Sequence, residues 1–154
     1  MPTEIAECAA RLDIDGLKKL LKNATDINKG YLYNGALAYT IYNNSYIWNR
    51  VPAYWLKYPD DMYNRLTKFN RIMDMLLEAG ANPTYGMDMA ARYGNVELVE
   101  FLIDRGANFN YASGNYGPWE RAAREAGNYG VAQFFIDFKT IENGKCPRYI
   151  KSAL

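Results

Sequence analysis

The sequence predicts an all-α fold in which pairs of short helices recur along the chain and stack into a solenoid. The motif Ala-Ala-Arg at residues 9–11 recurs at residues 90–92, and an amphipathic helical pattern follows it in both places. Each unit then closes with a similar turn, Asp-Ile-Asn at residues 26–28 and Asn-Phe-Asn at residues 108–110. Because a single helical pair cannot bury its own apolar face, such units are stable only when they stack.

Composition and charge fit one globular domain. The chain has 154 residues, of which 49% are hydrophobic and 23% charged, which is enough for a core. The net charge of +1 gives no electrostatic reason to expect a nucleic-acid or membrane partner. No apolar run approaches the roughly 20 residues of a membrane span, and no signal-peptide pattern opens the chain. Cys8, on an apolar helix face, and the distant Cys146 are expected to be reduced thiols in the cytoplasm.

The chain contains no histidine, which lowers the prospect of catalysis. Its absence removes Ser-His and Cys-His nucleophile pairs, imidazole acid-base chemistry and the commonest zinc ligand. Carboxylates remain, but we expect Asp60 and Asp61 to start a helix, Asp88 to hydrogen-bond the backbone, and Glu120 and Glu125 to lack a catalytic partner. Residues 13–16 read as a turn and helix cap, since the later ligands of a calcium loop are missing. We therefore expect no enzyme, no cofactor and no metal.

The clearest unit runs over residues 85–110. A first helix carries the small residues Ala90 and Ala91 and ends at Gly94, and a second places its apolar side chains mostly on one side. Gly106 then supplies a left-handed helix end. The motif A-A-x-x-G followed by V-E-L-V-x-F-L-I-x-x-G-A-N-x-N resembles the ankyrin repeat family, although residues 85–88 replace the usual Thr-Pro-Leu-His corner.

The resemblance implies one ankyrin-repeat domain over residues 1–154, built of about four repeats. The expected repeats are 3–30, 31–84, 85–114 and 115–138, followed by a tail at 139–154. Repeat two holds an aromatic-rich insertion at residues 43–61, where a short helix is expected at 53–58 after Pro52. From there Met62, Leu66, Phe69, Met73 and Leu76 step by four and three residues, which predicts one continuous helix over residues 60–79.

The family uses its inner helices and finger tips to bind other proteins, so the resemblance places candidate contacts there. Residues 31–63 alone hold eight Tyr and two Trp, and Tyr, Trp and Arg are enriched at interface hot spots. The candidate partner-binding residues are Tyr31, Tyr33, Tyr42, Trp48, Arg50, Tyr54, Trp55, Arg92, Tyr93, Tyr111, Tyr116 and Trp119, with Glu120 and Arg124 exposed beside them. Two alternatives stay open: the tyrosines fill gaps between helices, or the insertion packs down as a structural cap.

The resemblance implies a non-catalytic module, monomeric when alone, that binds another protein and inhibits or sequesters it. Small ankyrin-like chains of this kind resemble immunity, anti-defence or host-manipulating factors, which would place it in the cytoplasm or in a host cytoplasm. A host location would follow for a viral chain or one secreted by a non-classical route. The alternatives are a scaffold subunit that bridges proteins and, with no basic stripe to support it, a nucleic-acid binder.

Overall fold

The computed structural model describes residues 3–24, 27, 35–47, 52–108 and 118–140. Every regular element in this part of the chain is helical, as the sequence predicts. The elements are α1 (Glu4–Ala10), α2 (Ile14–Leu21), α3 (Gly35–Asn43), the 3-10 helix η1 (Ser45–Ile47), α4 (Pro52–Lys57), α5 (Pro59–Glu78), the 3-10 helix η2 (Pro83–Gly86), α6 (Met87–Tyr93), α7 (Val96–Asp104), α8 (Pro118–Glu125) and α9 (Tyr129–Thr140).

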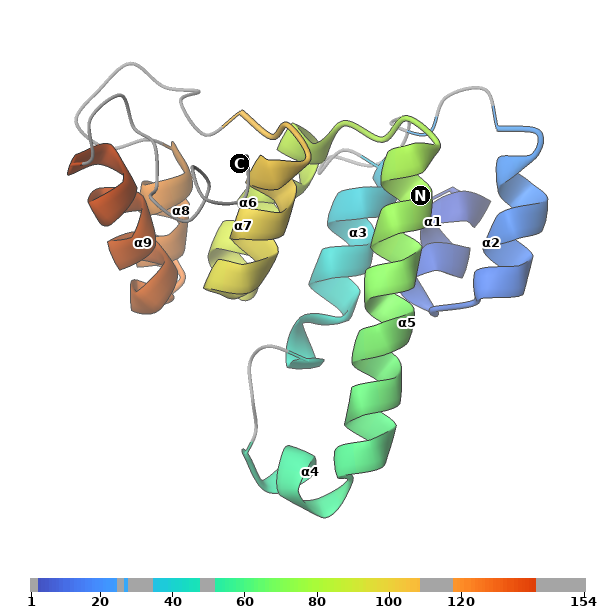
Figure 1. The fold of residues 1–154 in the computed structure, drawn as a ribbon, viewed down its shortest axis with the longest axis horizontal. Coiled ribbons are helices and arrows are strands. Elements are labelled where there is room, and N and C mark those ends of the chain that lie inside the picture. Colours follow the sequence, from blue (N-terminus) through green and yellow to red (C-terminus); the bar gives the residue numbers. More distant parts are fainter. Residues whose placement is uncertain (1–2, 25–26, 28–34, 48–51, 109–117, 141–154) are drawn as a thin grey trace, which may run out of the picture.

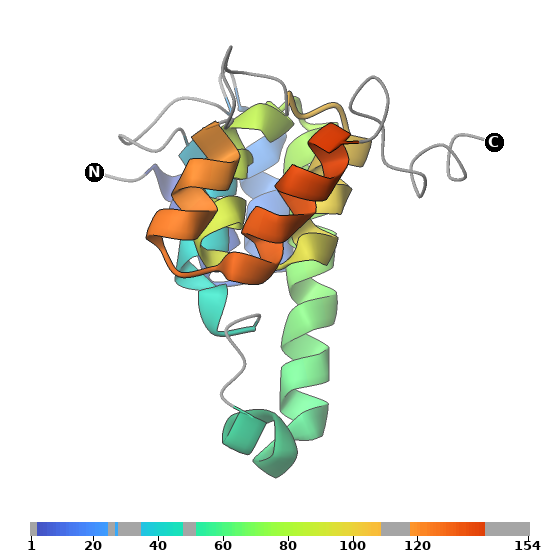
Figure 2. The same ribbon diagram turned by 90° about the vertical axis from the view of Figure 1, so that its left-hand side faces the viewer.

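The helices form two layers that run as a single row (Figures 1 and 2). One layer holds α1, α3, α6 and α8, and each of these helices contacts the next. The other layer holds α2, α5, α7 and α9. Within the pairs α1 and α2, α6 and α7, and α8 and α9, the two helices also contact each other. We call α1, α3, α6 and α8 the inner helices and the others the outer helices.

Side-chain caps and proline define where several helices begin. Thr3 accepts a hydrogen bond from the backbone N–H of Ala6, and Asn95 accepts one from that of Leu98. Asp13 accepts from the Gly16 N–H at 3.0 Å, so residues 13–16 are the expected turn and cap. Gly106 ends the α7 unit at a φ of +100°, a conformation that glycine adopts without strain.

Small side chains let the inner helices approach closely. Ala9, Ala90, Ala91 and Ala123 are each fully buried, and they lie on inner helices that contact one another. Larger apolar side chains, including Phe69, fill the space between the layers. The buried core therefore runs along the whole row, as stacking requires.

Two asparagines tie neighbouring units together through equivalent bonds. Asn44, in the turn after α3, donates from its side-chain amide to the carbonyl oxygen of Ala10 at the end of α1. Asn128, in the turn after α8, donates to the carbonyl oxygen of Ala91 at the end of α6. Ala10 and Ala91 occupy the same place in the repeated Ala-Ala-Arg motif. The repetition in sequence thus reappears as a repeated contact between units.

The long helix α5 confirms the expectation of one continuous helix over residues 60–79. It starts one residue earlier, at Pro59, where a proline fits because its missing N–H needs no helical partner. Met62, Phe69 and Met73 are buried, while Leu66 is half-buried. The short helix expected at residues 53–58 is α4, shifted by one residue. The sequence did not predict η2, which forms between α5 and α6.

Candidate protein-binding surface

The structure describes the side chains of five of the twelve candidate residues. Tyr42, Trp55, Arg92, Tyr93 and Trp119 lie in helices α3, α4, α6 and α8. The remaining candidates, Tyr31, Tyr33, Trp48, Arg50, Tyr111 and Tyr116 together with the side chain of Tyr54, lie outside the described residues. The site can therefore be built from two described regions, the inner helices and the segment around α4.

Tyr42 and Tyr93 join two adjacent inner helices. Their rings meet edge to face, with centroids 5.3 Å apart and planes at 76°. Tyr42 is 51% exposed, whereas Tyr93 is half-buried. An edge-to-face pair is favourable because the positive ring edge meets the negative face of its neighbour. Tyr42 thus combines a fixed position with a large exposed surface, as a contact residue requires.

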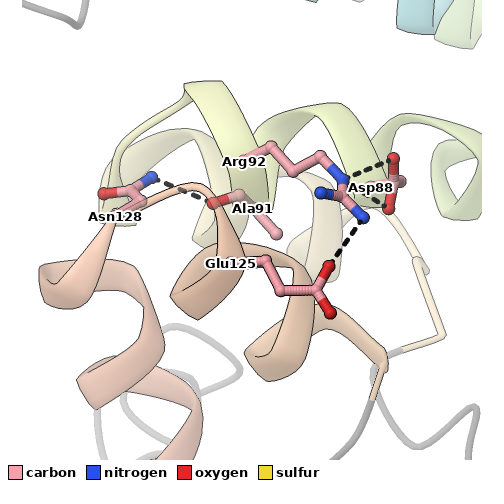
Figure 3. A network of polar contacts seen from close by, with 5 residues as sticks. All are labelled: Asp88, Ala91, Arg92, Glu125 and Asn128. Atoms are coloured by element: carbon pink, nitrogen blue, oxygen red, sulfur yellow. Dashed lines mark hydrogen bonds and ion pairs between the residues drawn. The ribbon is translucent and has the colours of Figure 1, made fainter.

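Arg92 lies between two carboxylates from different helices, as Figure 3 shows. Its Nε atom lies 3.2 Å from Oδ2 of Asp88, one turn earlier on α6. Its Nη2 atom lies 3.6 Å from Oε2 of Glu125 on α8. All three side chains are a third or more exposed, so solvent screens the pairs and their main effect is to orient the guanidinium.

Two expectations about acidic residues are wrong. Asp88 bonds Arg92 rather than the backbone, because residues four apart on a helix face each other. Glu120 is 1% exposed rather than on the surface, and it accepts a hydrogen bond from Arg124 on the same helix. A buried carboxylate needs such a charged partner, so Glu120 belongs to the structure of α8.

Trp119 also has a structural role. Its side chain is half-buried, and its indole N–H donates to the carbonyl oxygen of Asn108 at 2.9 Å. The Asn108 N–H in turn donates to the Thr84 hydroxyl at 2.8 Å. Trp119 therefore helps to join α8 to the segment that follows α7.

Residues 52–65, which comprise α4 and the first turns of α5, extend beyond the ends of the other helices (Figures 1 and 2). We call this segment the arm. Leu56 is 82% exposed, Tyr63 70% and Tyr58 43%, so the arm presents several large apolar surfaces to solvent. Trp55 is half-buried and packs toward the core. At the base of the arm, Met62 is buried and fixes it to the row.

Arg65 braces the arm against η1. Its Nη1 atom donates to the Tyr46 hydroxyl and its Nε atom to the Asp61 carboxylate, both at 3.0 Å. The guanidinium also lies over the Tyr46 ring, 5.9 Å from its centroid. The bonds to Tyr46 and Asp61 raise the pKa of Arg65, which stays charged. The bond to Tyr46 thus links the base of the arm to η1.

The sequence did not single out Leu56, Tyr58 and Tyr63 as contact residues, although all three are exposed on the arm. In this region it predicted Trp48, Arg50, Tyr54 and Trp55. One signal was available for Tyr63. It follows Met62 directly, and adjacent residues lie about 100° apart on a helix, so burial of one turns the other outward. Leu56 and Tyr58 lie in and after a helix of six residues, too short to show a periodic apolar stripe.

Neither a metal-binding cluster nor a membrane-spanning helix is found in the part of the chain that the structure describes. Within this part, no three His, Cys, Asp or Glu side chains gather into a group that could hold a metal ion. None of the described helices has the length and apolar character needed to cross a membrane. The features that remain are the aromatic and charged side chains of the arm and of the inner helices.

Comparison with known proteins identifies one unit of the row. Residues 87–114, which contain α6 and α7, match the family model described as ankyrin repeat. No curated protein and no solved structure matches the chain. Ankyrin repeats are generally modules of protein–protein interaction and are generally not catalytic. Residues 87–114 are therefore an ankyrin repeat, and this match supports an ankyrin-repeat protein.

Proposed function

We propose that this chain binds another protein through its arm and, by occupying that partner, inhibits or sequesters it. The observation that carries the proposal is the exposure of Leu56 and Tyr63 on a segment that extends past the row. Single exposed apolar residues are common, but a cluster on one projecting segment is typical of an interaction site. The arm includes the candidate residues Tyr54 and Trp55, and Leu56, Tyr58 and Tyr63 extend the proposed interface beyond them.

The bracing of the arm supports this proposal. Binding costs free energy when loose side chains and segments become ordered, and a segment held in place beforehand avoids part of that cost. Arg65 links the arm to Tyr46 and keeps Asp61 aligned in the first turns of α5. An arm fixed in this way is suited to enter a cleft of its partner, which is how it would inhibit an enzyme.

The remaining parts of the proposal concern the row. We propose that it is one domain of four ankyrin-like repeats, formed by α1 and α2, α3 and α5, α6 and α7, and α8 and α9. The arm lies within the insertion at residues 43–61 and the start of α5, and the tail follows at 139–154. Tyr42 and Arg92 would add contacts from the inner helices. We place the protein in the cytoplasm, as a monomer until it meets its partner.

A scaffold role is the second candidate, and one observation favours it. The arm belongs to α4 and α5, whereas the Arg92 cluster belongs to α6 and α8, so the two regions could hold different partners. A scaffold would bind two proteins at once, and an inhibitor would form a one-to-one complex that lowers the activity of its partner.

Site-specific photo-crosslinking tests the proposal. A photoreactive phenylalanine replaces Tyr63 on the arm or, as a matched control, Tyr129 on α9, whose exposed fraction of 69% is close to the 70% of Tyr63. Crosslinking in the native cell extract, followed by mass spectrometry, should give one dominant protein with the Tyr63 probe only. Equal capture by both probes, or capture by neither, would refute binding through the arm.

A further inference from the structure

A groove separates two outer helices, α5 and α7. Its volume is about 300 Å³, at the lower end of the roughly 300–1,000 Å³ of ligand sites. The apolar lining consists of Leu66, Phe69 and Met73 from α5 and Leu98 and Phe101 from α7. Leu66 and Phe101 are half-buried, whereas the other three belong to the buried core beneath them. A space of this size accepts a few side chains rather than a whole helix.

An ion pair crosses from α5 to α7 beyond one end of the groove. Near the end of α7, Arg105 forms an ion pair with Asp74 of α5 and lies over the Phe101 ring, 4.7 Å from its centroid. This contact holds the two helices together there. At the start of α7 the groove reaches Leu66, and α5 continues beyond that level into the arm (Figure 1). A partner segment could therefore lie along the groove and leave it near Leu66.

The charge of the lining indicates which partner fits. Glu97 is the charged residue that lines the groove, and it is exposed and without an ion pair among the described residues. The other polar residues of the lining, Asn70 and Asn95, are neutral, and Asn95 already caps α7. A segment with apolar side chains for the floor and a Lys or Arg beside them would complement this surface.

We propose that this groove binds an amphipathic helix of a partner protein, with apolar residues on one face and a basic residue that pairs with Glu97. A helix fits because the groove runs between two helices, and ridges of side chains pack into such grooves. Apolar residues spaced three and four apart would reach the floor from one side. The proposal does not rest on the arm, because every residue that lines the groove lies outside residues 52–65.

Selection from a displayed library of random 16-residue peptides tests the groove and needs no purified partner. The wild-type chain is the bait, and an Asn70→Trp variant serves for counter-selection, because the indole would fill the groove. As a matched control, Asn23→Trp makes the same change on an exposed residue after α2, outside both the groove and the arm. Circular dichroism checks that all three proteins are equally helical.

We expect peptides that carry apolar residues at helical spacing and at least one Lys or Arg. Their affinity, measured by fluorescence anisotropy, should fall at least about tenfold in Asn70→Trp and stay unchanged in Asn23→Trp. Glu97→Gln should weaken binding about threefold and reduce its salt dependence. Equal affinity for wild type and Asn70→Trp, enrichment of acidic peptides, or a dimer whose contact Asn70→Trp abolishes would each overturn the proposal.

Discussion

The side-chain amide of Asn44 bridges two backbone carbonyls, that of Thr40 on its own helix at 2.8 Å and that of Ala10 on α1 at 3.1 Å. Asn44 is 2% exposed, so water cannot replace these bonds. The contact joins the first two units of the row, and Asn128 makes the matching contact between the last two. Cohesion between units thus depends on polar bonds as well as on the apolar core.

Asn44→Ala should destabilise the fold by about 1–3 kcal/mol, because it removes the side-chain donor that bonds the Ala10 carbonyl across two units and adds a second bond to the Thr40 carbonyl. Chemical denaturation, monitored by circular dichroism, measures the change. Asn43→Ala is the matched control: Asn43 is exposed and bonds the Tyr39 carbonyl of its own helix, so its loss should cost less than about 0.5 kcal/mol. If the two variants lost the same stability, the bridge to Ala10 would not hold the units together.

Leu66→Pro tests whether α5 is one continuous helix in solution. A proline in the helix interior removes a hydrogen bond and clashes with the preceding turn, at a cost of about 3 kcal/mol or more. We expect a large fall in the melting temperature. Leu66→Ala, which keeps the backbone N–H, should cost much less because Leu66 is only half-buried. An unchanged melting temperature in Leu66→Pro would mean that α5 is interrupted there.

Leu98→Asp should abolish folding. Leu98 is 6% exposed and belongs to the buried core, where a carboxylate would lack a partner. Leu98→Met, which keeps the volume and apolar character, should cost less than about 1.5 kcal/mol. Far-UV circular dichroism separates the two outcomes, and a helical spectrum in Leu98→Asp would show that the stack does not depend on this residue.

The cap of α2 predicts a dependence of stability on pH. The hydrogen bond from the Gly16 N–H holds the pKa of Asp13 below its ordinary value of 3.8. A carboxyl whose pKa is lowered by folding stabilises the fold above its unfolded pKa, and this contribution is lost as the pH falls through the folded pKa. An NMR titration should place the Asp13 midpoint below 3.8. Asp13→Asn should remove this part of the loss in acid, and a midpoint at or above the ordinary value would contradict the cap.

The fold was predictable where the sequence repeats or keeps a helical period. The spacing of Met62, Phe69 and Met73 predicted α5, because apolar residues at this spacing lie on one side of a helix. That side can then pack against the neighbouring helices. The bond between Asp88 and Arg92 could also have been predicted, since the two residues lie four apart. The contact of Arg92 with Glu125 could not, because it depends on how α6 packs against α8. The groove between α5 and α7 likewise depends on packing between separate helices and leaves no local pattern.

We propose that the arm contacts a partner protein and does not serve as a structural cap. Tyr63→Ala and Tyr129→Ala make the same change at two tyrosines of nearly equal exposure, 70% on the arm and 69% on α9. The direct measurement is the affinity of each variant for the purified partner by calorimetry, beside its melting temperature. We predict that Tyr63→Ala loses about 2 kcal/mol of binding free energy with little change in melting temperature, while Tyr129→Ala binds as the wild type does. Wild-type affinity in Tyr63→Ala, or a loss of stability that accounts for its weaker binding, would contradict the claim.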